Sequence, residues 1–427
     1  MRFNVFKNTV FPIIIGIVLV MISCASKSKG DGSISKLGID NREKPVMEVK
    51  KDTSIIIGIS RTDLYLPLLK GKRVGVVANQ TSVIFTKSAT QPLGAIKYTH
   101  IVDSLLALKV DIKKVFAPEH GFRGKADAGE IVKDGIDTKT KLPIVSLYGK
   151  NKKPSATQLK NLDVVIFDIQ DVGARFYTYI STLHYVMEAC AEAGIPVFVF
   201  DRPNPNGNYI DGPILEKEHT SFVGMHPIPV VHGMTIGEYA KMINGEKWLA
   251  NGIQCDLKVI GMKHYKHELK YSLPIKPSPN LPNDQAINLY PSLCFFEGTN
   301  VSAGRGTETQ FQIFGSPFLN PELYSFQFTP QPNEGSKFPK HKNKTCYGKD
   351  LTKLETINTL NLNWLIEAYK NTEKKTEFFN SFFTKLAGTK TLQHQIESGL
   401  SEKAIKATWE TGLNHFENTR KNYLIYP

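Results

Sequence analysis

Residues 163–169 read DVVIFDI, and this short stretch decides the fold that the sequence predicts. Its centre is an unbroken run of β-branched and aromatic side chains, which is typical of a strand buried on both faces. Comparable runs rich in Val, Ile and Phe occur elsewhere in the chain, at residues 73–78, 112–117, 143–147 and 195–200. Strands this apolar belong to a parallel sheet that helices cover on both sides.

Helical segments separate these runs. Residues 93–108 and 176–193 carry apolar side chains at helical spacing, and Gly194 is placed to end the second helix. Strands and helices that alternate in this way predict a Rossmann-like, doubly wound α/β domain over residues 54–240.

The rest of the chain, residues 241–427, is less regular. Pro-rich loops surround two strand-like stretches, at 255–260 and 287–296, and two later stretches, 360–369 and 377–386, have helical patterns. We expect a smaller mixed α/β domain that closes over the cleft of the first.

The N-terminus has the features of a lipoprotein signal peptide. Arg2 and Lys7 precede an apolar run at residues 10–22. A membrane span needs about 20 apolar residues, so this run is too short to be one. Small Ser23 precedes Cys24, so we expect cleavage after residue 23 and lipidation of Cys24. A simple secretory peptide with an incidental cysteine is the alternative.

Residues 24–53 are rich in Ser, Gly, Lys and Asp without apolar periodicity, which predicts a flexible tether. The chain is therefore expected to be exported and lipid-anchored. Ala25, Ser26 and Lys27 follow Cys24 without an acidic run, which favours an anchor facing the periplasm.

Composition limits the partners. The formal net charge is +13, from 53 Lys and Arg against 40 Asp and Glu, but the lysines are scattered and no basic motif interleaved with aromatic residues is present. Nucleic acid is therefore not expected. An anionic cell-wall polymer fits the charge, and solubility alone explains it as well.

Cys190 and Cys294 lie in apolar runs, where buried free thiols are common.

Several enzyme classes lack their motifs. The sequence has no GxGxxG after its first strand, no GxxxxGK[ST] and no GxSxG, so neither a nucleotide nor any other cofactor is expected and a serine esterase is disfavoured. No HExxH is present, and no metal is predicted. Metal-assisted hydrolysis stays open as an alternative because several strand-end side chains could converge, namely Glu119, His120, Asp168, Asp171 and His232.

The strand ends carry most of the polar motifs. In an open parallel sheet the ligand crevice lies beyond the carboxyl ends of the strands. Amides, carboxylates and guanidinium groups follow the strands there, in NQT (79–81), PEHGFRG (118–124), DIQDVGAR (168–175) and DRPNP (201–205). The sequence thus predicts a cleft lined with acidic residues.

Longer strings carry a family resemblance, namely FAPEHGFRG (116–124), DIQDVGARFYTY (168–179), DRPNPNG (201–207), PSPNLP (277–282) and FEGTNVSAGRGT (296–307). They resemble the exo-β-N-acetylmuramidases, NamZ-type glycoside hydrolases of peptidoglycan turnover. The resemblance spans nearly the whole chain after the tether. It implies release of N-acetylmuramic acid from the non-reducing end of peptidoglycan fragments.

Such a reaction needs a proton donor and a group that stabilises an oxocarbenium-like centre. Glu119 is the expected acid, and His120 and Arg123 lie close enough in sequence to orient it or the substrate. The alternative is a Glu119 that only pairs with Arg123 or caps a loop. Asp171 is the candidate second group, acting as a nucleophile, as a base or by orienting the acetamido group; Glu297 is a rival acid.

Further residues are expected to bind substrate. Arg175, at the start of a helix, and Arg305, in a Gly-Arg-Gly turn, are competing clamps for the lactyl carboxylate, and an interdomain salt bridge is the alternative for each. Tyr177 and Tyr179 are expected to contact the sugar or else to pack in the core. The remaining candidates are polar side chains of the two domains, namely Asp168 as a loop brace, Gln170, Asn280, Asn300 and Ser302.

Two other functions fit the acidic cleft. One is a metal- or base-assisted amidase or esterase acting on cell-wall material. The other is a muropeptide-binding lipoprotein without turnover.

Overall fold

The structure is a computed structural model that describes residues 54–86, 97–123 and 133–427. The predicted signal peptide, Cys24 and the whole of the predicted tether, residues 24–53, lie outside the described residues. Among the described residues, no helix has the length and apolarity that crossing a membrane requires.

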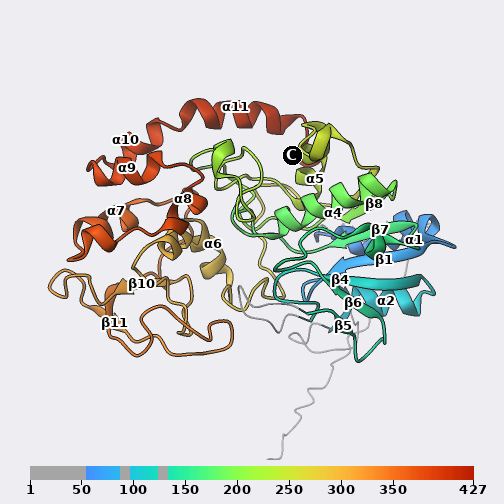
Figure 1. The fold of residues 1–427 in the computed structure, drawn as a ribbon, viewed down its shortest axis with the longest axis horizontal. Coiled ribbons are helices and arrows are strands. Elements are labelled where there is room, and N and C mark those ends of the chain that lie inside the picture. The colour runs from blue at the N-terminus through green and yellow to red at the C-terminus, as the bar shows by residue number, and fades with distance from the viewer. Residues whose placement is uncertain (1–53, 87–96, 124–132) are drawn as a thin grey trace, which may run out of the picture. The chain divides into compact units, whose positions relative to one another are not determined.

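A seven-stranded sheet forms the first part of the chain, in the order β5-β6-β4-β1-β7-β8-β9 (Figure 1). All of the runs predicted as its strands are strands in the structure, at β1 (Arg73–Ala78), β4 (Asp111–Ala117), β6 (Pro143–Ser146), β7 (Val164–Asp168) and β8 (Val197–Phe200). Neighbouring strands pair in parallel except for β5 (Gly135–Ile136), which runs antiparallel to β6. The predicted parallel α/β fold is confirmed.

Alternate residues of β7 show why the sheet is covered on both sides. Val165 and Phe167 pack into one apolar cluster together with α4 (Tyr179–Ala193) and α5 (Ile236–Gly245). Val164 and Ile166 point into a second cluster, with α1 (Thr62–Leu69) and α2 (Ile101–Ala107). Successive strand residues point to opposite faces, so a continuous apolar run can fill two cores.

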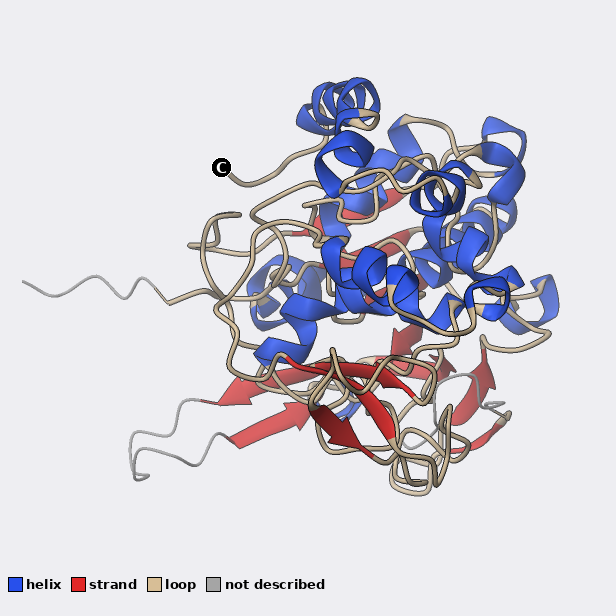
Figure 2. Ribbon diagram, turned by 90° about the vertical axis from the view of Figure 1, so that its left-hand side faces the viewer, coloured by secondary structure: helices blue, strands red, loops and turns tan. Residues whose placement is uncertain are grey.

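The helix predicted at 93–108 is shorter in the structure. Residues 97–100 form strand β3 (Lys97–His100), which pairs with β2 (Val83–Thr86) as an antiparallel hairpin, visible at the lower left of Figure 2. His100 Nδ1 accepts a hydrogen bond from Val102 N at 3.3 Å and so caps α2. The helix predicted at 176–193 is confirmed as α4, and Gly194 ends it in the left-handed conformation, with φ of 65°.

The stretch 255–260 is a strand, β9 (Leu257–Ile260), but it pairs with β8 at the edge of the large sheet. The sheet-forming part of the chain therefore extends beyond residue 240, where the first domain was expected to end. The other stretch, 287–296, was wrongly predicted as a strand. It lies in α6 (Asp284–Leu293), whose first turn is capped by Asn283 through a 2.9 Å hydrogen bond from Ala286 N, and in the 3-10 helix η4 (Cys294–Gly298).

The C-terminal region combines a small antiparallel sheet with helices, which confirms a smaller mixed α/β region. The sheet has the order β10-β12-β11, with β10 (Ile313–Ser316), β11 (Phe326–Phe328) and β12 (Cys346–Asp350). The helices predicted at 360–369 and 377–386 correspond to α7 (Asn363–Lys370) and α8 (Ser381–Ala387). The other helices are α3 (Ala156–Leu159), α9 (Thr391–Glu397), α10 (Glu402–Ala407) and α11 (Glu410–Lys421).

The end of the chain returns to the large sheet, and Figure 1 shows α11 crossing towards α5. Arg420 Nη1 donates to Gly233 O at 2.8 Å, and Tyr426 Oη donates to Asp201 Oδ2 at 2.7 Å, just after β8. The last residues therefore pack on the first part of the chain.

The described cysteines are all buried and free of disulfide bonds, namely Cys190, Cys255, Cys294 and Cys346.

Candidate active site

A cavity of about 750 Å³ lies beyond the carboxyl ends of the parallel strands. It is lined by loops that follow β4, β6 and β7 and by segments of the C-terminal region. Among the predicted site residues, those that line it are Glu119, His120, Tyr177, Asn280, Glu297 and Arg305.

The sheet topology explains why these loops meet. The chain runs from β1 outward through β4 to β6, and then crosses to the other side of β1 to form β7. Loops after strands on the two sides of such a switch point diverge around a crevice, where ligands of open α/β sheets bind. Glu119 follows β4, on one side of the crevice, and Thr178 comes after β7, on the other.

Two hydroxyl groups hold the Glu119 carboxylate. Tyr148 Oη donates to Glu119 Oε1 at 2.8 Å, and Thr178 Oγ1 donates to Glu119 Oε2 at 2.6 Å. Tyr148 lies two residues after the end of β6, so segments that follow β4, β6 and β7 all contribute to the position of this one carboxylate. Arg123 pairs with Asp137 and not with Glu119, so the structure does not show the pairing that was one of the two alternatives for Glu119.

A carboxylate and an arginine lie together on the C-terminal side of the cavity. Arg305 Nε donates to Glu297 Oε1 at 3.1 Å, and the guanidinium lies 5.3 Å above the centre of the Phe311 ring. Burial opposes the charge of Arg305, but the neighbouring Glu297 raises its pKa, so it stays a cation. Among the described residues, no protein acceptor is recorded for its two Nη groups.

Asn280 and Tyr177 contribute neutral polar atoms to the cavity. Asn280 Nδ2 donates to Gly335 O at 2.7 Å, while its Oδ1 is buried without a partner among the described residues. Tyr177 Oη donates to Pro277 O at 2.8 Å, and burial raises the pKa of Tyr177 well above its ordinary value. Asn280 Oδ1 is thus an acceptor available to a ligand.

Asp171 and Asp168 do not line the cavity. Asp171 is 3% exposed; its Oδ2 accepts from Gly173 N at 2.7 Å and lies 3.6 Å from His232 Nε2. Asp168 is fully buried and accepts two hydrogen bonds from Arg202, at 2.7 and 2.9 Å. Burial raises the pKa of Asp168, and Arg202 opposes that shift. Asp168 thus braces its loop.

Arg175 does not line the cavity. It is fully buried, and its Nη atoms donate to the carbonyl oxygens of Pro213, Ile228, Leu386 and Ala387, at 2.7 to 3.0 Å. Burial lowers the pKa of Arg175 to about 9. Its role in the structure is to join the loop after β8 to α8, by carbonyl contacts rather than by the salt bridge that was the alternative.

The other predicted residues outside the cavity form hydrogen bonds or ion pairs within the protein. Gln170 Nε2 donates to Asp171 O and Pro203 O, at 2.8 and 2.6 Å. Arg123 pairs with Asp137, with Nη2 2.7 Å from Oδ2, and Tyr179 Oη donates to Glu119 O at 3.4 Å.

Asn300 and Ser302 also lie away from the cavity. Ser302 is 2% exposed, and its Oγ accepts from Gly304 N at 3.2 Å. Asn300 accepts through its main-chain oxygen from Ser316 Oγ and His341. The loop that contains both residues holds the Gly-Arg-Gly turn of Arg305.

Two family models together match most of the chain. The family model of the N-terminal part of exo-beta-N-acetylmuramidase NamZ matches residues 74–285, and the model of its C-terminal part matches residues 288–426. The chain belongs to the NamZ exo-β-N-acetylmuramidase family. It is therefore a glycoside hydrolase.

Individual relatives agree with this family. The chain is 39% identical to the peptidoglycan beta-N-acetylmuramidase NamZ of Bacillus subtilis (strain 168), over 98% of this chain and 100% of the relative. A crystal structure of a DUF1343 family protein from Bacteroides fragilis is similar with a TM-score of 0.77 and 44% identity, over 87% of this chain and 99% of that one. A second such structure from the same organism has a TM-score of 0.71 and 27% identity, with the same coverage.

In this NamZ-family chain the cavity is shared by the segments that the two family models match. Glu119, Tyr148 and Thr178 come from the N-terminal segment, and Glu297 and Arg305 come from the C-terminal one. Two carboxyl groups from different parts of the chain thus face one cavity. These two are the carboxyl groups among its described lining residues.

Two residues that hold Glu119 were not predicted as site residues. Tyr148 follows the apolar run 143–147, so inspecting the end of that strand, like those of its neighbours, would have found it. Thr178 lies between Tyr177 and Tyr179 in the family motif, but its hydroxyl gives no local signal of its target.

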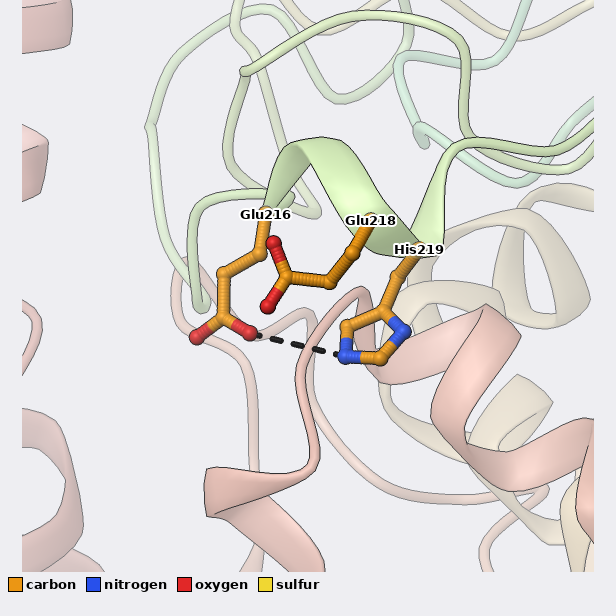
Figure 3. Close-up of side chains that lie close together, drawn as sticks. All are labelled: Glu216, Glu218 and His219. Atoms are coloured by element: carbon orange, nitrogen blue, oxygen red, sulfur yellow. Dashed lines mark ion pairs between the residues drawn. The ribbon is translucent and has the colours of Figure 1, made fainter.

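The side chains of the alternative metal site do not converge. Asp168 pairs with Arg202, Asp171 lies beside His232, and Glu119 is held by hydroxyls. Among the described residues, one group has ligand atoms within 4.8 Å of one another, formed by Glu216, Glu218 and His219 (Figure 3). These residues are not part of the cavity lining, and Glu216 already accepts from Thr389 Oγ1 at 2.6 Å.

Proposed function

We propose that this exo-β-N-acetylmuramidase releases N-acetylmuramic acid from the non-reducing end of peptidoglycan fragments in the cavity described above, with Glu119 as the proton donor. The observation that carries the residue assignment is the pair of hydroxyls, Tyr148 and Thr178, that hold both oxygens of a carboxyl group at the cavity wall. The substrate is supported by the family and by the activity for which the Bacillus subtilis relative, a peptidoglycan beta-N-acetylmuramidase, is named.

The hydrogen bonds to Glu119 suit an acid that gives up its proton. When the proton passes to the departing glycosidic oxygen, negative charge develops on the carboxylate. Tyr148 and Thr178 are already placed to donate to that charge, so little reorganisation is needed at the moment of reaction. The two hydroxyls also fix the direction of the carboxyl group.

Glu297 is our candidate for the second carboxyl group, in place of Asp171. Hydrolysis of a glycoside needs stabilisation of a positive anomeric centre on the face away from the leaving group. Glu297 lines the cavity, whereas Asp171 is buried behind it. The substrate's own acetamido oxygen is the other group that could supply this stabilisation.

Arg305 is our candidate for recognising the lactyl carboxylate. Its Nε is engaged by Glu297, and its Nη groups are the donors that a planar carboxylate can meet in parallel. Asn280 Oδ1, which is buried without a partner among the described residues, would accept from a sugar hydroxyl or amide. Both contacts would select the muramyl unit at the chain end.

The test is the Glu119→Gln variant, assayed by release of N-acetylmuramic acid from a muramyl disaccharide. Glutamine keeps the size of the side chain and an acceptor oxygen, but it delivers no proton, so we expect the rate to fall roughly 10²–10⁴-fold. Glu216→Gln, which changes an exposed glutamate outside the cavity, is the matched control. A wild-type rate in Glu119→Gln would remove Glu119 from the mechanism.

The same assay separates the other candidate functions. A metal-assisted amidase or esterase would lose activity in chelator and would release no muramic acid. A non-catalytic muropeptide-binding protein would bind the disaccharide without cleaving it.

We also propose that the protein is exported and is anchored by a lipid on Cys24, facing the periplasm. Support comes from the apolar run at 10–22 and from Ser23 directly before Cys24. Cys24→Ser should abolish incorporation of labelled fatty acid and should move the protein from the membrane to the soluble fraction. Retention of the label would place the lipid on another residue.

A further inference from the structure

The mouth of the cavity carries exposed aromatic side chains. Phe338 lines the cavity yet is 91% exposed, and Phe382, also in the lining, is 37% exposed. Phe222 is a third, half-buried phenylalanine of the lining. Exposed apolar groups gathered around a pocket are typical of a ligand-binding surface, because a protein gains nothing by leaving them in water.

The inner end of the cavity is different. Tyr177, Asn280, Tyr290 and Phe311 are all buried, with 8% exposure or less. Glu119 is half-buried: its side chain is more exposed than these residues and less exposed than Phe338. An enzyme that cuts at a chain end holds the terminal sugar at the closed end of its pocket, so the bond to be cut would lie at the depth of Glu119.

The loop that carries Phe338 is fastened on both sides. Before it, Gly335 O accepts from Asn280 Nδ2 at 2.7 Å, and the main chains of Asn333 and Ser336 exchange two hydrogen bonds of 3.1 Å. After it, Lys340 Nζ donates to Phe296 O and Val301 O, both at 2.9 Å. Phe338 is thus held out at the mouth by an anchored loop.

Phe222 lies beside the residue that holds the acid. Its ring centre is 6.1 Å from that of Tyr148, the donor to Glu119. Lys152 Nζ lies 4.6 Å above the Phe222 ring and fixes it from outside. The acid must reach the leaving oxygen, so an aromatic ring next to it is close to the leaving side of the bond.

We propose that Phe338, together with Phe382 and Phe222, forms a binding subsite for the hexosamine ring on the leaving side of the bond. This inference rests on the proposed function. The C–H groups on one face of a pyranose are apolar and carry partial positive charge, which suits the electron-rich face of an aromatic ring. A cavity of about 750 Å³ leaves room for a second sugar unit, since pockets of roughly 300–1,000 Å³ hold drug-sized ligands.

The experiment compares Phe338→Ala and Phe338→Trp with the wild type. Each is assayed with a muramyl-hexosamine disaccharide, and free N-acetylmuramic acid, which fills the inner end alone, is measured as an inhibitor. In Phe338→Ala we expect KM for the disaccharide to rise about tenfold, the size of one aromatic contact, with an unchanged inhibition constant for N-acetylmuramic acid. Phe338→Trp should keep KM near the wild-type value, because tryptophan keeps an aromatic ring for the sugar to pack against.

Leu323→Ala, which truncates a 61% exposed side chain outside the cavity lining, is the control and should behave as the wild type. An unchanged KM in Phe338→Ala, or an equal loss of affinity for free N-acetylmuramic acid, would overturn the subsite. Failure of the proposed function would look different, because the wild type itself would then release no N-acetylmuramic acid.

Discussion

Two arginines that the sequence offers as carboxylate binders have opposite surroundings. Arg175 is fully buried and donates to four main-chain carbonyls, so its fork is already occupied. Arg305 lines the cavity and donates one recorded hydrogen bond, to Glu297. Whether the Nη groups of such an arginine are occupied by the protein or lie at a cavity therefore depends on tertiary neighbours that the local motif does not show.

Substitution of Arg305 should change substrate selectivity. If its Nη groups bind the lactyl carboxylate, Arg305→Ala should lower kcat/KM on a β-N-acetylmuraminide by about 100-fold, since removing a charged partner costs roughly 2–5 kcal/mol. The loss on the matching β-N-acetylglucosaminide, which lacks the lactyl group, should be much smaller. Arg305→Lys should be intermediate, because it keeps the charge without the planar fork. Equal losses on both substrates would instead assign Arg305 to support of Glu297.

The loop after β4 shows how an element positions a side chain of the cavity wall. His120 and Gly121 both adopt positive φ, 67° and 77°, and so turn the chain sharply after Glu119. Arg123 then ties the loop to Asp137, through hydrogen bonds of 2.7 and 3.3 Å, and lies 3.8 Å from Asp103. Arg123 thus fixes the loop a few residues after Glu119.

The Arg123–Asp137 pair should make stability depend on pH. Burial of Asp137 opposes its ionisation, but hydrogen bonds from Arg123 and Thr140 prevail and lower its pKa to about 2. A folded-state pKa below the unfolded one adds stability above the unfolded value, which is lost as the pH falls towards 2. Asp137→Asn should thus be less stable than the wild type by roughly 2 kcal/mol at pH 6. Thermal unfolding should show this difference shrinking between about pH 4 and pH 2, and a constant difference would contradict the prediction.

At the scale of the whole molecule, the two segments matched by the family models are joined by buried contacts. Arg175 links the loops at Pro213 and Ile228 to the end of α8, and Leu386 of that helix also lines the cavity. The C-terminal residues return to the large sheet, where Tyr426 meets Asp201. The cavity depends on these contacts because its lining comes from both segments.

Removal of the Arg175 guanidinium should destabilise the whole protein. Arg175→Ala would remove the donors to four buried carbonyls; Ile228 O keeps a hydrogen bond from Leu215 N, whereas the carbonyls of Pro213, Leu386 and Ala387 lose these donors. Each unsatisfied buried group costs about 1–3 kcal/mol. We expect urea unfolding to show a loss of at least about 3 kcal/mol, because such losses are not fully additive. Arg73→Ala is the matched control, since it breaks a solvent-screened pair with Asp163 and should cost much less stability. Equal losses in the two variants would show that Arg175 does not join the segments.

Local sequence was sufficient for the large sheet and for the helix that ends at Gly194. A strand buried on both faces has to be apolar at every position, and Val164 to Phe167 meet that condition without reference to any partner. Local sequence was misleading for residues 287–296, where the cap by Asn283 and the tertiary packing of α6 produce a helix. It also did not show that β9 would join the large sheet, because the pairing partner of an edge strand is chosen by the fold.

By itself, the sequence determined the parallel sheet, the loops in which polar side chains follow its strands and, through its motifs, the family. Only the tertiary structure decided which of those side chains share a cavity. Glu119 and Asp171 both follow β-strands, yet one faces the cavity between hydroxyls and the other is buried beside His232. The physical reason is that apolar periodicity is a local property, whereas the direction of a loop side chain depends on hydrogen bonds to residues far away in the chain.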